Sequence, residues 1–120
     1  MVTIKLNGSE YTLACTLRVA YELQNQHNHA AYSKILSEVG NMPLEQQLDF
    51  LYIAFRIANP EVAKTFTKEM FRLYILDNEE FNASVIVDML KGVISGIMGK
   101  EIPNNAAEAE AAAAGDPEKN

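Results

Sequence analysis

Apolar and polar residues alternate at the start of the chain. Val2, Ile4 and Leu6 are separated by single polar residues, and Asn7-Gly8 follows them. Asn-Gly is the pair that best tolerates positive φ at both central residues of a tight hairpin loop. The pattern therefore predicts an N-terminal β-hairpin.

The position of this loop determines which residues of the two strands face each other. With Asn7-Gly8 as the loop, Lys5 faces Glu10 and the two are expected to form an ion pair. Opposite residues share a face of such a ribbon. The apolar face consists of Val2, Ile4, Leu6, Tyr11 and Leu13. Because an isolated two-stranded ribbon is marginally stable in water, this face is expected to pack on the helices that follow.

Beyond residue 16, apolar residues recur every three or four positions, which is typical of amphipathic helices. This period predicts five helices, over residues 17–26, 30–39, 43–58, 68–76 and 77–100. The predicted fold class is mainly α, with an N-terminal β-hairpin followed by a small bundle of about five helices. Residues 101–120 contain mostly Ala and Glu, and are predicted to form a disordered or weakly helical C-terminal tail.

Residues at the helix ends support these boundaries. Thr16 and Thr67 each stand where an N-cap is needed. Gly40 suits the position after the second helix, and Pro43 suits the first position of the third. In the run DNEE, Asp77 is followed three residues later by Glu, which predicts a capping box at the start of the longest helix.

The last predicted helix is apolar nearly all round between residues 85 and 98, whereas a surface helix usually has one apolar stripe. Its surplus apolar surface is a candidate for binding a partner or a second copy of the chain. The candidate residues are Ile86, Met89, Leu90, Val93, Ile94 and Ile97. In the alternative interpretation, Gly92 and Gly96 allow close approach of neighbouring segments and seat this helix inside its own bundle.

Charge divides the chain into two parts. The 120 residues carry a net charge of −6, and residues 101–120 contain five acidic residues and one Lys. We therefore expect one folded domain over residues 1–100 and an acidic Ala/Glu-rich tail over residues 101–120. The basic residues of the first part are scattered, so nucleic-acid binding is not expected. No apolar run is long enough to span a membrane, and no secretory signal is recognisable.

Few residues suggest catalysis or metal binding. His27 and His29 lie two apart in a polar loop without Cys or further His nearby in sequence, so no metal site or cofactor is expected. Cys15 is the single cysteine, and a small buried side chain is its favoured role. A small enzyme that uses Cys15 or His27 stays open as an alternative.

Two stretches carry a family resemblance. TIKLNGSEYTLACTLRVAYELQ combines a hairpin with an amphipathic helix, and ANPEVAKTFTKEMFRLYILDNEEFNASVIVDML combines a capped short helix, an acidic turn and a long helix. This layout, over residues 1–100, resembles the tail assembly chaperones of long-tailed phages and prophages.

The resemblance implies a non-enzymatic protein in the cytoplasm of the bacterial host. Such chaperones bind the tape measure protein, help to recruit tail tube subunits, and are absent from the mature virion. The alternative is a structural tail or connector component.

The family often makes a longer form of the chaperone by a −1 ribosomal frameshift. Met98-Gly99-Lys100 can be encoded by the slippery run G GGA AAA, and the residues that follow are acidic and of low complexity. The resemblance therefore implies a longer form that shares residues 1–100.

Overall fold

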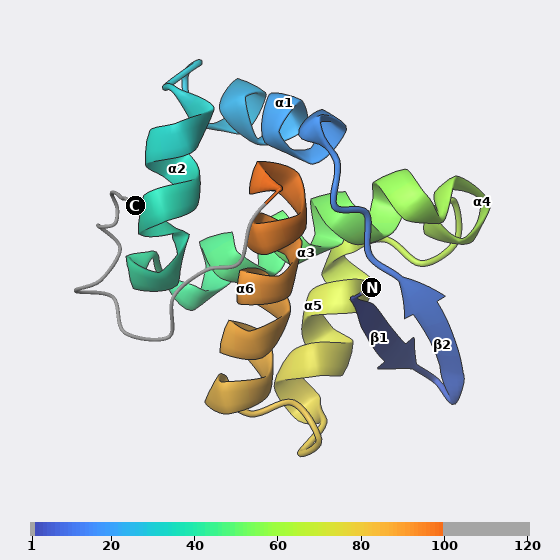
Figure 1. Ribbon diagram of the computed structural model, residues 1–120. Coiled ribbons are helices and arrows are strands. Elements are labelled where there is room, and N and C mark those ends of the chain that lie inside the picture. The colour runs from blue at the N-terminus through green and yellow to red at the C-terminus, as the bar shows by residue number, and fades with distance from the viewer. Residues whose placement is uncertain (1, 100–120) are drawn as a thin grey trace.

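A computed structural model describes residues 2–99 of the chain (Figure 1). The chain begins with a hairpin of β1 (Thr3–Leu6) and β2 (Ser9–Thr12). The helices that follow are α1 (Leu17–Gln26), α2 (Tyr32–Glu38), the 3₁₀ helix η1 (Val39–Asn41), α3 (Leu44–Ala58), α4 (Pro60–Ala63), α5 (Lys68–Asp77) and α6 (Ala83–Met98). The predicted fold class, mainly helical with an N-terminal hairpin, is confirmed. The short α4 was not expected from the sequence.

The hairpin has the predicted register. Its pairs are Thr3 with Thr12, Ile4 with Tyr11, Lys5 with Glu10, and Leu6 with Ser9. Asn7 and Gly8 have φ angles of 53° and 84°, as the tight loop requires. The expected ion pair is wrong. Within residues 2–99, the Glu10 carboxylate accepts a hydrogen bond of 3.0 Å from the Thr3 hydroxyl instead.

The apolar face of the hairpin lies on α3. Ile4, Leu6 and Leu13 are buried in the core. Just beyond β2, the backbone N–H of Ala14 donates to the carbonyl of Ala54 at 3.0 Å. The Tyr11 and Phe55 rings meet edge to face with centroids 5.6 Å apart. Because these contacts fix the ribbon on the helical bundle, it does not depend on its own marginal stability.

Helix α3 is the centre of the core. Eight of its side chains are buried: Gln47, Leu48, Phe50, Leu51, Tyr52, Ile53, Ala54 and Phe55. Phe55 is also surrounded by aromatic rings from other elements, with Phe71 of α5 at 5.4 Å and Phe66 at 6.0 Å between centroids. In Figure 1, α6 crosses in front of α3 and α1 lies across the upper end of α6. Helix α3 therefore receives both the hairpin and the later helices.

An ion cluster ties α5 to α3. The Arg72 guanidinium binds the Asp49 carboxylate at 3.0 Å and also approaches Glu45 at 3.4 Å and Glu69 at 3.9 Å. The hydrogen bond to Asp49 is the main cause of the raised pKa of Arg72. This cluster is a structural contact between two helices, because all of its cationic donors have carboxylate partners.

The start of α6 differs from the prediction. The capping box at Asp77 is wrong, because α5 continues through Asp77 and α6 begins only at Ala83. The Asn82 side chain is the N-cap and accepts from the backbone N–H of Val85 at 3.0 Å. This choice allows Phe81 to pack on Tyr74, with ring centroids 6.1 Å apart. Tertiary packing thus selects one of two local capping options.

The other helix ends are partly as predicted. Helix α1 has the predicted bounds, although the Thr16 side chain makes no capping hydrogen bond. Thr67 caps α5 by accepting from the backbone N–H of Met70 at 3.4 Å, as expected. Gly40 is not a left-handed terminator but part of η1, whose carbonyls accept from the buried Gln47 amide at 3.1 and 3.2 Å. Pro43 is the N-cap of α3 and not its first residue.

Candidate functional site

The structure places the six candidate partner-binding residues of α6 in the core. Ile86, Met89, Leu90, Val93, Ile94 and Ile97 are between 0% and 9% exposed. These residues do not form the exposed surface that the sequence suggested, because α6 is covered by its own bundle. Partner binding through them would first require their exposure. The large apolar residues that α6 does expose are Val87, at 39%, and Met98, at 42%.

The two small residues of α6 have a clear packing role. A Cβ atom at Gly92 would lie 2.6 Å from Cγ2 of Val2, and one at Gly96 would overlap Cβ of Cys15. Real Cβ atoms essentially never approach so closely. The missing side chains therefore let the start of the hairpin and the segment before α1 lie directly against α6. This agrees with the interpretation that Gly92 and Gly96 seat the helix in its own bundle.

Cys15 and the two histidines lack the geometry of a catalytic pair. The half-buried Cys15 thiol donates to the carbonyl oxygen of Leu13 at 3.6 Å. Burial raises the pKa of this thiol, which disfavours the reactive thiolate. His27 ends α1 and His29 has a left-handed backbone, and neither hydrogen bonds to Cys15 in the described part of the chain.

Two further properties of the described residues bear on the class of site. Residues 2–99 contain no group of three or more His, Cys, Asp or Glu side chains placed to share a metal ion. In the same residues, every helix falls short of the length and apolar character that crossing a bilayer requires.

Several large apolar side chains of α5 are exposed. A groove of about 830 Å³ is lined by Phe66, Met70, Leu73, Tyr74, Asp77, Asn78, Glu79 and Glu80. Met70 and Leu73 are 46% and 48% exposed, and they lie three residues apart on the same side of the helix. Exposed large apolar side chains gathered in a groove indicate a site for a protein or another apolar partner.

The groove continues towards the hairpin. A second hollow of about 330 Å³ shares Phe66 and Met70 with the first and reaches Asn7 and Tyr11. At this hollow, the backbone N–H of Asn7 donates to the hydroxyl of Tyr74 at 3.0 Å. The hairpin turn thus forms one wall of a surface whose floor is α5.

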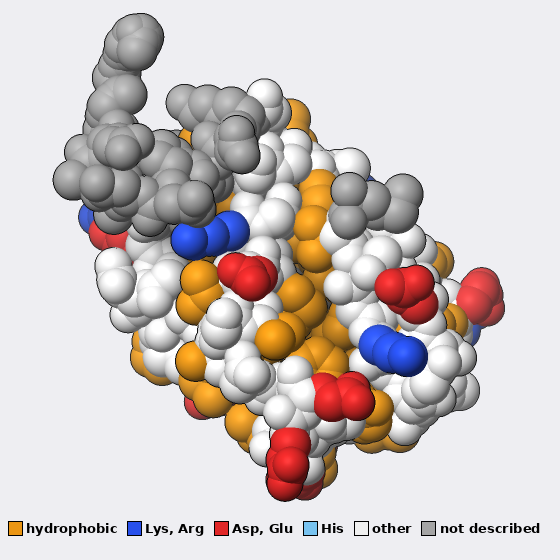
Figure 2. All heavy atoms as spheres, turned by 60° about the horizontal axis from the view of Figure 1, so that its bottom comes forward, with side chains coloured by type: hydrophobic (Ala, Val, Ile, Leu, Met, Phe, Trp, Pro, Cys, Tyr) orange, Lys and Arg blue, Asp and Glu red, His pale blue; other side chains and the backbone are white. Residues whose placement is uncertain are grey.

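One end of the groove is acidic. Asp77, Glu79 and Glu80 line it, and no Lys or Arg of the described chain does. Figure 2 shows the end of the molecule where α5 connects to α6, with carboxylates at its tip and hydrophobic side chains beside them. The groove would therefore suit a partner that has cationic side chains next to an apolar stripe.

The sequence contains a local indication of this groove, namely apolar residues of α5 that lie outside its main apolar stripe. Met70, Phe71, Tyr74 and Ile75 recur at helical spacing and form an apolar stripe, of which Phe71 and Ile75 are buried. Leu73 and Leu76 fall outside that stripe, and they are 48% and 53% exposed. A short helix with apolar residues off its buried face indicates a second contact surface.

Comparison of the chain with protein-family models, with curated proteins and with solved structures gives no match. The residues of the chain and their arrangement are therefore the basis for proposing a function.

Proposed function

We propose that this protein is a non-enzymatic tail assembly chaperone that binds an amphipathic helix of the tape measure protein in the α5 groove. The observation that carries the proposal is the apolar groove with an acidic end, formed by Met70, Leu73 and Tyr74 beside Asp77 and Glu79. The resemblance of residues 1–100 to such chaperones supports the same role.

The dimensions of the groove suit a helical partner. Helix α5 has 10 residues and is therefore roughly 15 Å long, which matches about three turns of a docked helix. Helix-in-groove binding uses apolar anchors at positions i, i+3 or i+4, and i+7. A tape measure protein is a long helix with exposed apolar stripes, and an unassembled one needs such stripes covered. Basic residues beside one of these stripes would meet the acidic end of the groove.

The proposed role includes a place and a time of action. The protein works in the cytoplasm of the bacterial host, helps to recruit tail tube subunits, and leaves before the virion is complete. A longer form that shares residues 1–100 supplies the tube contact. A slippery run in the codons for residues 98–100 would lie just beyond Ile97, the last core residue of α6, which supports this part of the proposal. Mass spectrometry of phage-producing cells should detect this longer product.

A pull-down with matched variants tests the groove. The full chain is co-expressed with the tape measure protein as wild type, as Leu73→Asp, and as Val87→Asp. Leu73 lines the groove, whereas Val87 is similarly exposed on α6 and is not among the residues that line this groove. Loss of an apolar anchor costs on the order of 2 kcal/mol, so Leu73→Asp should reduce recovery of the tape measure protein about tenfold or more. Val87→Asp should leave recovery unchanged.

Two results would contradict the proposal. Equal recovery with all three proteins would mean that the groove does not hold the tape measure protein. Detection of the chain in purified virions would instead identify a structural tail or connector component, because a chaperone of this kind leaves before the particle is finished.

A further inference from the structure

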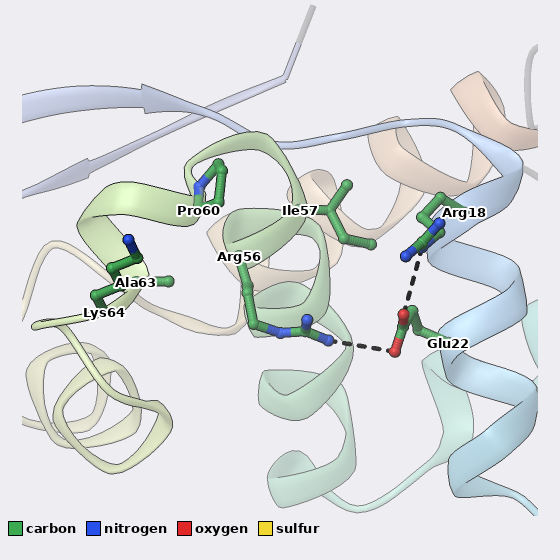
Figure 3. A pocket seen from close by; sticks show the side chains of 7 residues that line it. All are labelled: Arg18, Glu22, Arg56, Ile57, Pro60, Ala63 and Lys64. Carbon is green, nitrogen blue, oxygen red and sulfur yellow. Dashed lines mark hydrogen bonds and ion pairs between the residues drawn. The ribbon is translucent and has the colours of Figure 1, made fainter.

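A second surface, separate from the α5 groove, has the opposite charge. A hollow of about 540 Å³ lies between α1, the end of α3 and α4. It is lined by Arg18, Glu22, Arg56, Ile57, Pro60, Ala63 and Lys64. Figure 3 shows the guanidinium groups of Arg18 and Arg56 turned towards Glu22 on one side of the hollow, with Lys64 on the other side.

Cations outnumber carboxylates in this hollow. The Glu22 carboxylate is shared, with Arg18 and Arg56 each 3.4 Å from it. Each guanidinium has five N–H donors, so most of these donors are not used by Glu22. Lys64 lies 3.2 Å from Glu61, which is outside the lining. In a chain with a net charge of −6, such a concentration of exposed positive charge favours a ligand that brings carboxylates.

The floor between the cations is apolar. It consists of the side chains of Ile57, Pro60 and Ala63. Small aliphatic side chains can cover such a floor while neighbouring carboxylates reach the cations. The ligand chemistry that fits is therefore an acidic peptide segment in which Glu alternates with Ala.

Residues 101–120 of the same chain have this composition. They contain the run AAEAEAAAA, and Glu108 and Glu110 are separated by one Ala. We propose that this segment occupies the basic hollow of its own molecule, with Glu108 and Glu110 bound by Arg18, Arg56 and Lys64. The proposal does not depend on the function proposed above, because it uses a different surface and a different partner.

The path of the chain supports an intramolecular contact. Gly96, in the last turn of α6, packs on Cys15, which is two residues before α1 begins. Arg18 lies in the first turn of that helix. Glu108 is ten residues beyond Met98, where α6 ends, and ten residues can span up to about 33 Å when extended. Glu108 is therefore within reach of the hollow from the end of α6.

Nuclear magnetic resonance of the full chain tests the contact. Wild type is compared with a Glu108→Gln, Glu110→Gln variant, which keeps size and removes two charges. Amide chemical shifts should differ at Arg18, Ala63 and Lys64, and should not differ at Leu73 in the α5 groove. The differences should shrink several-fold in 0.5 M NaCl, where charge interactions between exposed groups are screened. Identical spectra in the hollow, or differences confined to another surface, would overturn the proposal.

Zero-length cross-linking of Lys to carboxylates gives an independent readout. In the full chain, Lys64 should link to Glu108 or Glu110, whereas the exposed Lys34 on α2 should link several-fold less. Arg56→Gln should reduce the Lys64 link several-fold. A mixture of ¹⁴N-labelled and ¹⁵N-labelled protein distinguishes the source of the segment. Links within one isotope only support the proposal, and mixed-isotope links would overturn it in favour of a segment from a second copy.

Discussion

The backbone N–H of Asn7 donates a hydrogen bond of 3.0 Å to the hydroxyl of Tyr74, which is 67 residues further along the chain. Asn7 stands in the hairpin turn and Tyr74 in α5. The contact therefore fixes the hairpin beside the helix that forms the floor of the candidate groove. The same Tyr74 ring packs on Phe81, so one side chain orients both the hairpin and the connection to α6.

Removal of the Tyr74 hydroxyl should loosen the hairpin turn at Asn7 and have only a small effect on the stability of the domain. The contact is exposed, and water can replace the lost acceptor, so Tyr74→Phe should lower the free energy of unfolding by only about 0.5–1 kcal/mol. Amide hydrogen exchange at Asn7 should become faster in the variant. Unchanged exchange at Asn7 would show that this hydrogen bond does not hold the turn.

The glycines of α6 should tolerate Ala unequally. Gly96→Ala would place a methyl group on Cβ of Cys15, which cannot rotate away because it is fixed to the backbone. Overpacking costs about 1–3 kcal/mol, and the better helix propensity of Ala returns up to about 1 kcal/mol. Gly96→Ala should therefore lower the melting temperature.

Gly92→Ala should have a smaller effect, because its new methyl group meets the end of the Val2 side chain. The same substitution in a Val2→Ala background removes that contact and measures its coupling energy. A Gly96→Ala variant more stable than wild type would contradict the packing described for α6.

Two substitutions on α6 separate core from surface. Leu90 is 2% exposed, so Leu90→Ala should lower the free energy of unfolding by about 2–5 kcal/mol. Val87 is far more exposed, and Val87→Ala should change the free energy of unfolding by less than about 0.5 kcal/mol. Urea unfolding measures both. A Leu90→Ala protein with unchanged stability and weakened self-association would restore the interpretation of this face as an interface.

Cys15 should make stability fall at alkaline pH. Burial raises the pKa of its thiol, so as pH increases the unfolded chain loses the proton before the native chain does. This part of the stability is present below the pKa of the unfolded thiol, about 8.5, and declines above it towards the higher native pKa.

Urea midpoints between pH 7 and pH 10 measure this decline, and Cys15→Ala should lack it. The pKa of Tyr52 is also raised by burial, and this adds a similar decline at higher pH in both proteins. Parallel profiles for wild type and Cys15→Ala would contradict the prediction.

Local chemistry explains what the sequence could predict. The hairpin register follows from Asn7-Gly8 and strict alternation, and both are properties of neighbouring residues. The cap of α5 by Thr67 is also local. The predicted start of α6 was wrong because the side chains of Asp77 and Asn82 can both cap a helix. The packing of Phe81 on Tyr74 distinguishes the two, and Asn82 is the cap in the structure.

The candidate site depends on contacts that no local pattern contains. An all-apolar helix such as α6 is either a core element or an interface, and the pattern is the same in both cases. The segments that pack on it, among them Val2 and Cys15, are far away in sequence. The hollow that continues the α5 groove likewise has Asn7 in its lining because the hairpin turn docks on Tyr74. Only the exposed Leu73 and Leu76, off the buried stripe of their helix, gave a local hint.

The close approach of Cys15 to Gly96 also has a consequence for synthesis. The start of the chain leaves the ribosome first, and its packing partner on α6 leaves among the last of residues 2–99. At about 5–20 residues per second, the roughly 80 residues between these two positions take about 4–16 s to translate. During that interval Val2 and Cys15 have no α6 against which to pack. The packing of Val2 and of the segment before α1 on α6 therefore forms late, after the last helix has been synthesised.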